Sequence, residues 1–109
     1  MASFFRTAII KDIGTTPVNV LSPAAANRYT IIGLNLANTT DDVVVVDVTI
    51  TSATAVTGYY IKGLVIDPYT SAKLVTNGEK IILSENTVMT IVSDTNASID
   101  MVASYAEIV

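Results

Sequence analysis

The longest run of β-branched residues in the pattern of apolar and polar positions lies at residues 41–51, which read Asp-Asp-Val-Val-Val-Val-Asp-Val-Thr-Ile-Thr. Valine, isoleucine and threonine are stiff about χ1 and suit the pleated, half-buried surface of a strand. One side of this central strand is wholly apolar and is predicted to face the core: Val44, Val46, Val48 and Ile50. The other side begins apolar and becomes polar, as expected where another subunit docks: Val43, Val45, Asp47, Thr49 and Thr51.

The preceding segment, residues 28–37, is predicted to be a strand in which Ile32, Leu34 and Leu36 share one face. Residues 38–41 have the composition of a turn. We therefore expect these two strands to pair as a hairpin with one apolar face packed on the core.

Shorter strands are predicted on both sides of this pair. Residues 4–11 suggest a first strand at a sheet edge, and Gly63 within residues 58–66 suggests a β-bulge or a close backbone approach. Residues 72–83 read as a hairpin around Asn77 and Gly78, because Asn-Gly is the strongest short turn signal. About eight strands at short spacing predict an all-β fold: one antiparallel β-sandwich domain, jelly-roll or Ig-like, spanning residues 1–109.

Composition removes several kinds of chemistry. The 109 residues include no Cys and no His, so disulfides, thiolate metal sites and the commonest general base are excluded. A net charge of −4 disfavours a nucleic-acid partner. The N-terminus does not resemble a signal peptide, and no apolar run is long enough to span a bilayer, so we expect a soluble protein made in a cytoplasm.

The acids allow two interpretations each. Asp41 and Asp42 suggest either a calcium or acid–base site, or charges that keep a Val-rich strand from pairing with another chain. Adjacent strand residues point to opposite faces, which favours the second interpretation. Asp47 is either a buried acid with a raised pKa, or an exposed or interfacial partner for Lys or Arg, which we favour. No catalytic, cofactor-binding or metal-binding residue is predicted.

Tyrosines supply the remaining candidates. They could form a stacking platform, but tyrosine is also common at protein interfaces, which we favour here. A mean hydropathy of +0.54 is high for a small domain, and it suggests that neighbouring chains cover part of the surface in a homo-oligomer or a larger assembly. The predicted interface comprises Val43, Val45, Asp47, Tyr59, Tyr60, Tyr69 and Tyr105.

Several segments carry a resemblance to a known group of proteins. They are Tyr-Tyr-Ile-Lys-Gly-Leu-Val-Ile at 59–66, Ser-Ala-Lys-Leu at 71–74, Gly-Glu-Lys-Ile-Ile-Leu at 78–83 and the closing segment 98–108. Together they resemble small virion structural proteins of tailed bacteriophages, particularly phages of cyanobacteria and other marine hosts. The chain departs from that pattern at residues 67–70, where a Pro-Ala-Gly-like turn is typical, and at residues 85–86.

The resemblance implies a non-enzymatic virion protein, made in the host cytoplasm, that needs no cofactor, membrane or small-molecule substrate. A capsid decoration or cement protein bound to neighbouring subunits is the leading expectation, and its partners would be major capsid, neck or tail proteins. A neck, tail or fibre component is the alternative within this class. A receptor- or carbohydrate-binding module, or a minimal enzyme using Asp47 or Asp100, are the alternatives outside it.

Overall fold

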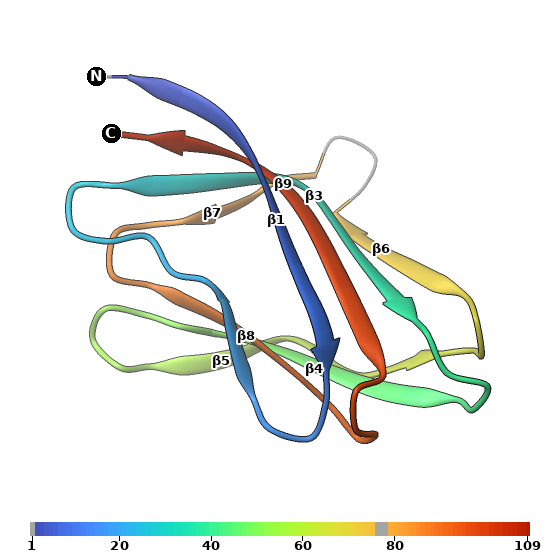
Figure 1. Cartoon of the computed structure of the whole chain (residues 1–109). Helices are drawn as coiled ribbons and strands as arrows, with labels where there is room; N and C mark the ends of the chain where they lie inside the picture. The colour runs from blue at the N-terminus through green and yellow to red at the C-terminus, as the bar shows by residue number, and fades with distance from the viewer. Residues whose placement is uncertain (1, 76–78) are drawn as a thin grey trace.

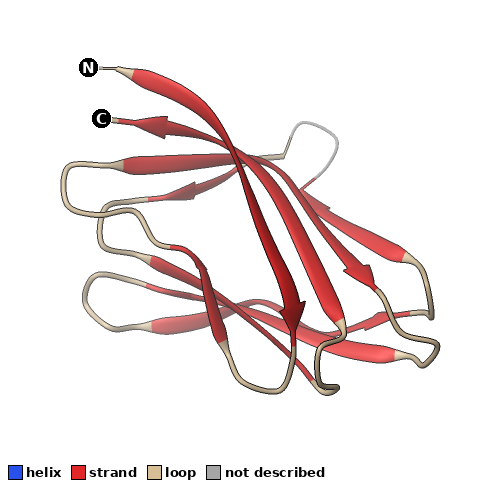
Figure 2. Ribbon diagram, viewed as in Figure 1, coloured by secondary structure: helices blue, strands red, loops and turns tan. Residues whose placement is uncertain are grey.

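The computed structural model describes residues 2–75 and 79–109, and within those ranges it contains nine β-strands and no helix (Figures 1 and 2). No helix in this part of the chain could therefore cross a membrane. The strands are β1 (Ser3–Ile13), β2 (Val18–Leu21), β3 (Arg28–Asn38), β4 (Val44–Thr51), β5 (Thr57–Ile66), β6 (Ser71–Val75), β7 (Ile81–Leu83), β8 (Val88–Ser93) and β9 (Ile99–Ile108).

The strands form two antiparallel sheets that pack face to face, so the predicted β-sandwich is confirmed. One sheet has five strands in the order β1-β9-β3-β6, with β7 also paired to β3, and the other has four in the order β2-β8-β4-β5. The pairing is nested, since β1 pairs with β9, β2 with β8, β3 with β6 and β7, and β4 with β5. Successive pairs alternate between the sheets, which is a jelly roll rather than an Ig-like arrangement.

The hairpin predicted for residues 72–83 is wrong. Strands β6 and β7 do not pair with each other; both run antiparallel to β3, β6 along Leu34–Ala37 and β7 along Tyr29–Ile31. They act as one edge strand with a break, because Val75, Ile81 and Leu83 all pack on the core. The predicted turn at Asn77 and Gly78 lies outside the described residues.

The hairpin predicted between residues 28–37 and the central strand is also wrong, because β3 and β4 belong to opposite sheets. The buried side chain of Asn38 stabilises the connection that crosses from β3 to β4. Its Nδ2 donates to the carbonyl oxygens of Asp42 at 2.8 Å and Ile66 at 3.0 Å, and its Oδ1 accepts from Thr40 N at 2.9 Å. Two apolar strand faces can be buried by packing across a core as well as by pairing side by side, and here they pack across it.

The inner face predicted for the central strand is confirmed, since Val44, Val46 and Val48 are fully buried and Ile50 packs against the core. On β3 the prediction is correct for Leu34 and Leu36, which are buried.

The prediction is wrong for Ile32. Its neighbour Ile31 is fully buried, whereas Ile32 is 44% exposed. The register with β9 shifts between Ile31 and Gly33, so Ile32 is the extra residue of a bulge that reverses the alternation.

Candidate interaction surfaces

The outer face of the four-stranded sheet brings together three of the residues predicted to form the interface. Val45 and Asp47 lie on β4, and Tyr59 on β5 lies opposite Thr49 of β4. Val65 stands opposite Val45 and is exposed. Val45, Asp47 and Tyr59 therefore share one side of one sheet, although whether they bind a partner stays a prediction.

Asp47 is tied to a bulge in β5. Register shifts between β4 and β5 set Asp47 opposite Lys62 and Gly63, and Gly63 has φ +70°, so the bulge predicted at this glycine is confirmed. The Gly63 N–H donates to Asp47 Oδ1 at 2.8 Å, and Lys62 Nζ donates to Oδ2 at 3.3 Å. The Gly63 hydrogen bond lowers the pKa of Asp47, and Lys62 lowers it further. The alternative of a buried acid with a raised pKa is therefore wrong.

Lys62 lies between two partners. Its Nζ pairs with Asp47 and lies 4.6 Å from the centroid of the Tyr59 ring, in a cation–π contact. The hydrogen bond and charge of Asp47 raise the pKa of Lys62, so this lysine is held as a cation rather than activated as a nucleophile. Because the Lys62 side chain is largely exposed, solvent screens this ion pair and it adds little to stability.

The other predicted tyrosines do not join this surface. Tyr60 is half-buried, and its hydroxyl donates to the carbonyl of Leu74 at 3.1 Å. Tyr69 lies exposed in the turn between β5 and β6, with φ +55°. Tyr105 packs against Tyr29 with ring centroids 4.5 Å apart. Three tyrosines thus occupy three separate places.

Val43, the remaining predicted interface residue, is exposed just before β4 begins. Asp41 and Asp42 precede it and are also exposed. Asp100 accepts a hydrogen bond from the backbone N–H of Asp12 at 3.0 Å. Across residues 2–75 and 79–109, no group of three or more acids is close enough to hold a metal ion.

A second surface, which the sequence analysis did not include, covers the outer face of the five-stranded sheet. Two rows of paired residues cross this face. One contains Phe5, Ala106, Thr30 and Ile82, and the other contains Ile9, Val102, Asn35 and Lys73. Five large apolar side chains are exposed here or in the adjacent bulge: Phe5, Ile9, Ile32, Ile82 and Val102.

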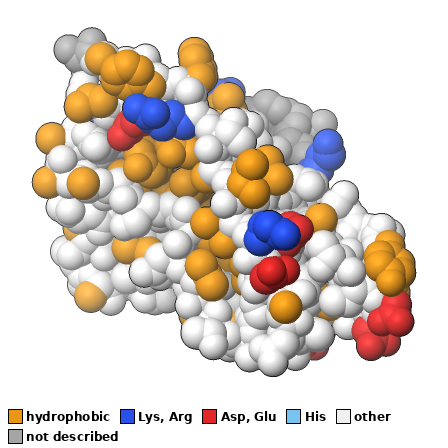
Figure 3. All heavy atoms as spheres, viewed as in Figure 1, with side chains coloured by type: hydrophobic (Ala, Val, Ile, Leu, Met, Phe, Trp, Pro, Cys, Tyr) orange, Lys and Arg blue, Asp and Glu red, His pale blue; other side chains and the backbone are white. Residues whose placement is uncertain are grey.

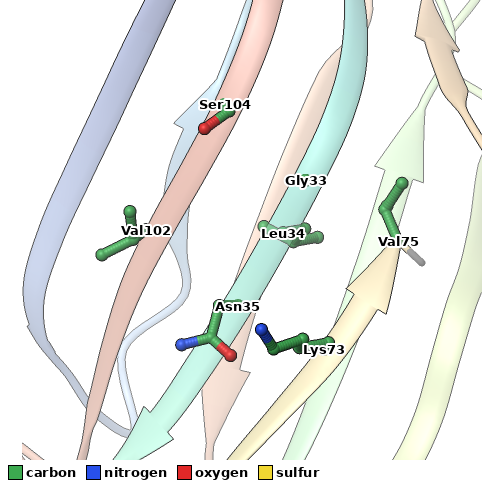
Figure 4. A pocket seen from close by; sticks show the side chains of 7 residues that line it. All are labelled: Gly33, Leu34, Asn35, Lys73, Val75, Val102 and Ser104. Carbon is green, nitrogen blue, oxygen red and sulfur yellow. The ribbon is translucent and has the colours of Figure 1, made fainter.

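A shallow depression of about 240 Å³ interrupts this face between β9, β3 and β6 (Figure 4). Gly33 leaves it open, because a Cβ there would meet only the Cβ of Ser104, at 3.9 Å. Asn35 and Lys73 point toward one another beside it. The Oδ1 atom of Asn35 is buried and has no hydrogen-bond partner among the described residues.

Charge is distributed unevenly over the molecule. Figure 3 shows hydrophobic side chains gathered near the two termini, whereas most acidic side chains in this view lie toward the other end. Near the termini, Arg6 Nε and Glu107 Oε1 pair at 2.6 Å, and the Arg6 guanidinium lies 5.4 Å from the centroid of Phe4. The charges of Arg6 and Glu107 are thus paired with each other, and apolar side chains lie near them.

No protein-family model matches this chain, and no curated protein is similar to it at a significant level.

Proposed function

We propose that this protein is a non-enzymatic structural subunit that binds neighbouring protein chains. The observation that carries the proposal is the outer face of the five-stranded sheet, where Phe5 is 82% exposed and Ile9 is 65% exposed. Contiguous apolar side chains on a small soluble domain mark interaction sites, and aromatic residues are enriched at the centres of interfaces. Covering this face would remove from water several of the apolar side chains that contribute to the high mean hydropathy of the chain.

The second contact region in this proposal is the predicted cluster on the four-stranded sheet, formed by Val45, Asp47 and Tyr59. The charge of Asp47 is held by Lys62 and Gly63, so the cluster can approach another protein without an unpaired anion at its centre. A subunit with contact regions on both sheets can bridge two neighbours, as a decoration or cement protein on a capsid must.

The place of assembly rests on the sequence resemblance alone. It supports a virion of a tailed bacteriophage, with a capsid decoration role as the leading proposal and a neck, tail or fibre position as the alternative. Jelly rolls occur in viral capsid proteins and also in lectins, so the topology is compatible with this role without selecting it.

A carbohydrate-binding module is less well supported. Stacking on a sugar would need aromatic rings beside acids in a groove, but Tyr60, Tyr69 and Tyr105 lie apart, and Tyr59 lies on an open sheet face. A glycan array with the purified chain tests this alternative, and specific binding that is lost in Tyr59→Ala would favour it.

The proposed function is tested on purified phage particles encoded by the same genome. Mass spectrometry should detect this chain at a fixed ratio to the major capsid protein, and electron microscopy should place it on the particle. If the chain is absent from the particles, the virion role is wrong. Static light scattering of the chain, alone and mixed with a particle protein, tests the broader proposal that it is a structural subunit. If the chain binds neither itself nor a particle protein, that proposal is contradicted.

A further inference from the structure

The four sheet edges are protected to different degrees. Edge strand β2 has four residues, β5 carries the bulge at Gly63, and the third edge is broken between β6 and β7. Edge strand β1 has eleven residues and keeps an unbroken register with β9 from Ser3 to Ile10. Short, bulged or interrupted edges resist pairing with other chains, whereas a long regular edge favours it. Among the described strands, β1 is therefore the edge best suited to add another strand.

The hydrogen-bond pattern shows which backbone groups of β1 face outward. Ala2 and Val109 exchange two backbone hydrogen bonds, at 3.2 and 2.9 Å, so they form a hydrogen-bonded pair of the ladder. Such pairs alternate with non-hydrogen-bonded ones, and the register continues without a shift to Ile10. The even-numbered residues of β1 thus bond to β9. The N–H and C=O groups of Ser3, Phe5, Thr7 and Ile9 point away from the sheet.

The sequence of β1 is complementary to itself when two copies run antiparallel with Thr7 opposite Thr7. Phe5 then stands opposite Ile9 on the outer face, and Phe4 stands opposite Ile10 on the other face. Aromatic residues opposite β-branched ones are favourable cross-strand pairs. The outward-facing backbone groups also match, because each pair along the new ladder joins two odd-numbered residues.

Charge supports the same register. With Thr7 at the centre, Arg6 stands opposite Ala8, and no like charges face each other. Moving the centre to Arg6 would place two arginines directly opposite, which is destabilising. Moving it to Ala8 would place Phe5 opposite Lys11 and remove the aromatic–β-branched pairs. The register centred on Thr7 is therefore favoured over both neighbours.

We infer that β1 pairs with β1 of a second copy of this chain, about a two-fold axis at Thr7, to join two five-stranded sheets into one. The pairing places Phe5 and Ile9 of both copies against each other. It deepens the proposed function, on which it rests, by naming a second copy as the partner at this edge. A closed two-fold contact of this kind uses the same residues on both subunits.

Single cysteines test the register, because the chain has no cysteine of its own. In the inferred dimer the two Thr7 residues form a hydrogen-bonded pair with Cα atoms about 5.5 Å apart, within disulfide range. Ser3→Cys is the matched control: it lies on the same exposed edge, but the two Ser3 residues would be offset by eight residues, or about 26 Å. Under mild oxidation at equal concentration, Thr7→Cys should form a disulfide-linked dimer at least tenfold faster than Ser3→Cys.

A second variant removes the hydrogen bond without adding a cross-link. Thr7→Pro deletes an N–H that has no partner among the described residues, so β1 should still pair with β9, and Thr7→Val is its matched control. Sedimentation equilibrium should show tenfold or more weaker dimerisation for Thr7→Pro and little change for Thr7→Val. Thermal unfolding checks that both variants fold.

The outcomes separate this inference from the proposed function. Equal cross-linking of Thr7→Cys and Ser3→Cys, or a monomer at every concentration, overturns the pairing even if the chain is found in particles. A third outcome also overturns the pairing: the chain is monomeric, and Thr7→Pro prevents it from binding a different particle protein. In that case another chain, not a second copy, occupies the β1 edge. If Thr7→Cys cross-links selectively but the chain is absent from particles, the pairing is supported and the proposed virion role is wrong.

Discussion

The outer face of the five-stranded sheet and its adjacent bulge expose five large apolar side chains, Phe5, Ile9, Ile32, Ile82 and Val102, whereas the strands of the four-stranded sheet expose Tyr59 and Val65 beside Thr49 and Thr90. Both sheets bury their inner faces in the same core, so the difference does not arise from folding requirements. Threonine suits a solvated strand, but an exposed phenylalanine or isoleucine gains nothing until another chain covers it.

The sheet edges repeat this contrast. Asp47 of β4 bonds to Lys62 and Gly63 in the bulge of β5, so this edge carries both a bulge and an ion pair. Both features hinder the pairing of a further strand with β5. Strand β1 has neither device over residues 3–10. Both edges of the four-stranded sheet are thus short or bulged, whereas the five-stranded sheet has the larger apolar outer face and a long regular edge at β1, which is where we place self-association.

The largest expected effect is the difference in stability lost when each of two adjacent isoleucines is truncated. Ile31→Ala removes a fully buried side chain and should lower the free energy of unfolding by about 2–5 kcal/mol. Ile32→Ala removes an exposed one and should cost less than about 0.5 kcal/mol. Urea unfolding of both variants measures the difference, and similar losses would show that the bulge does not place Ile32 on the outer surface.

The next largest effect is the change in self-association when a lysine is placed on either outer face. Ile9→Lys on β1 and Val65→Lys on β5 replace similarly exposed apolar side chains with the same charge. The first should weaken self-association by more than about tenfold, or 1.4 kcal/mol, because it would desolvate a lysine against Phe5 of a second copy. The second should change self-association little. Light scattering over a concentration series gives both values, and a larger effect of Val65→Lys would reverse our assignment of the faces.

Val45→Lys tests the surface predicted on the four-stranded sheet. Self-association should be unchanged, because this face lies away from β1. Binding to a second particle protein should fall by about tenfold if Val45 contacts it, since that contact would desolvate the added charge. If assembly and stability are both unaffected, this face is simply exposed to solvent.

A smaller effect concerns the protected edge. Asp47→Asn should lower the free energy of unfolding by about 1 kcal/mol, because the Gly63 N–H keeps only a neutral acceptor and Lys62 loses its anion. The pKa of Asp47 is lowered on folding, so its stabilisation is present above the ordinary value of 3.8 and is lost as pH falls through the folded pKa. Unfolding from pH 7 to pH 2 should therefore show the variant and the wild type converging at low pH. Asp41→Asn, in an exposed loop, is the control.

The smallest effect tests the depression beside Gly33. Gly33→Ala should raise the free energy of unfolding by about 0.5 kcal/mol, because the new methyl meets only Ser104 and the unfolded chain loses freedom. Gly63→Ala should instead destabilise by about 1 kcal/mol, since its φ of +70° disfavours a side chain. Thermal unfolding of the two variants should shift in opposite directions, and a loss in both would mean that Gly33 is needed for packing.

Much of the sandwich could be predicted because strand alternation reports burial directly. Val44, Val46 and Val48 were assigned to the core by this rule, and Gly63 to a bulge by its lack of a side chain. The rule fails at Ile31 and Ile32, where two identical neighbours give no sign of which is the extra residue. It also cannot say whether two apolar faces pair side by side or pack across a core.

The candidate surfaces were only partly predictable for the same reason. Val45, Asp47 and Tyr59 converge because facing positions on paired strands share a side. Tyr60, next to Tyr59, instead packs against the core, and its hydroxyl donates to the carbonyl of Leu74. On β1, Phe4 next to Phe5 and Ile9 next to Ile10 make both faces apolar, so alternation identifies no outer face. Only the sheet order shows that Phe5 and Ile9 stay uncovered.

Amide hydrogen exchange along β1, followed by NMR at low and high protein concentration, tests the central claim most directly. In dilute solution the amides of Phe5, Thr7 and Ile9 should exchange as unprotected groups, while those of Arg6 and Ala8 should be protected by β9. At concentrations where the chain associates, Phe5, Thr7 and Ile9 should become protected together. If these three amides remain unprotected while light scattering shows association, the chain assembles through another surface and our account of β1 is wrong.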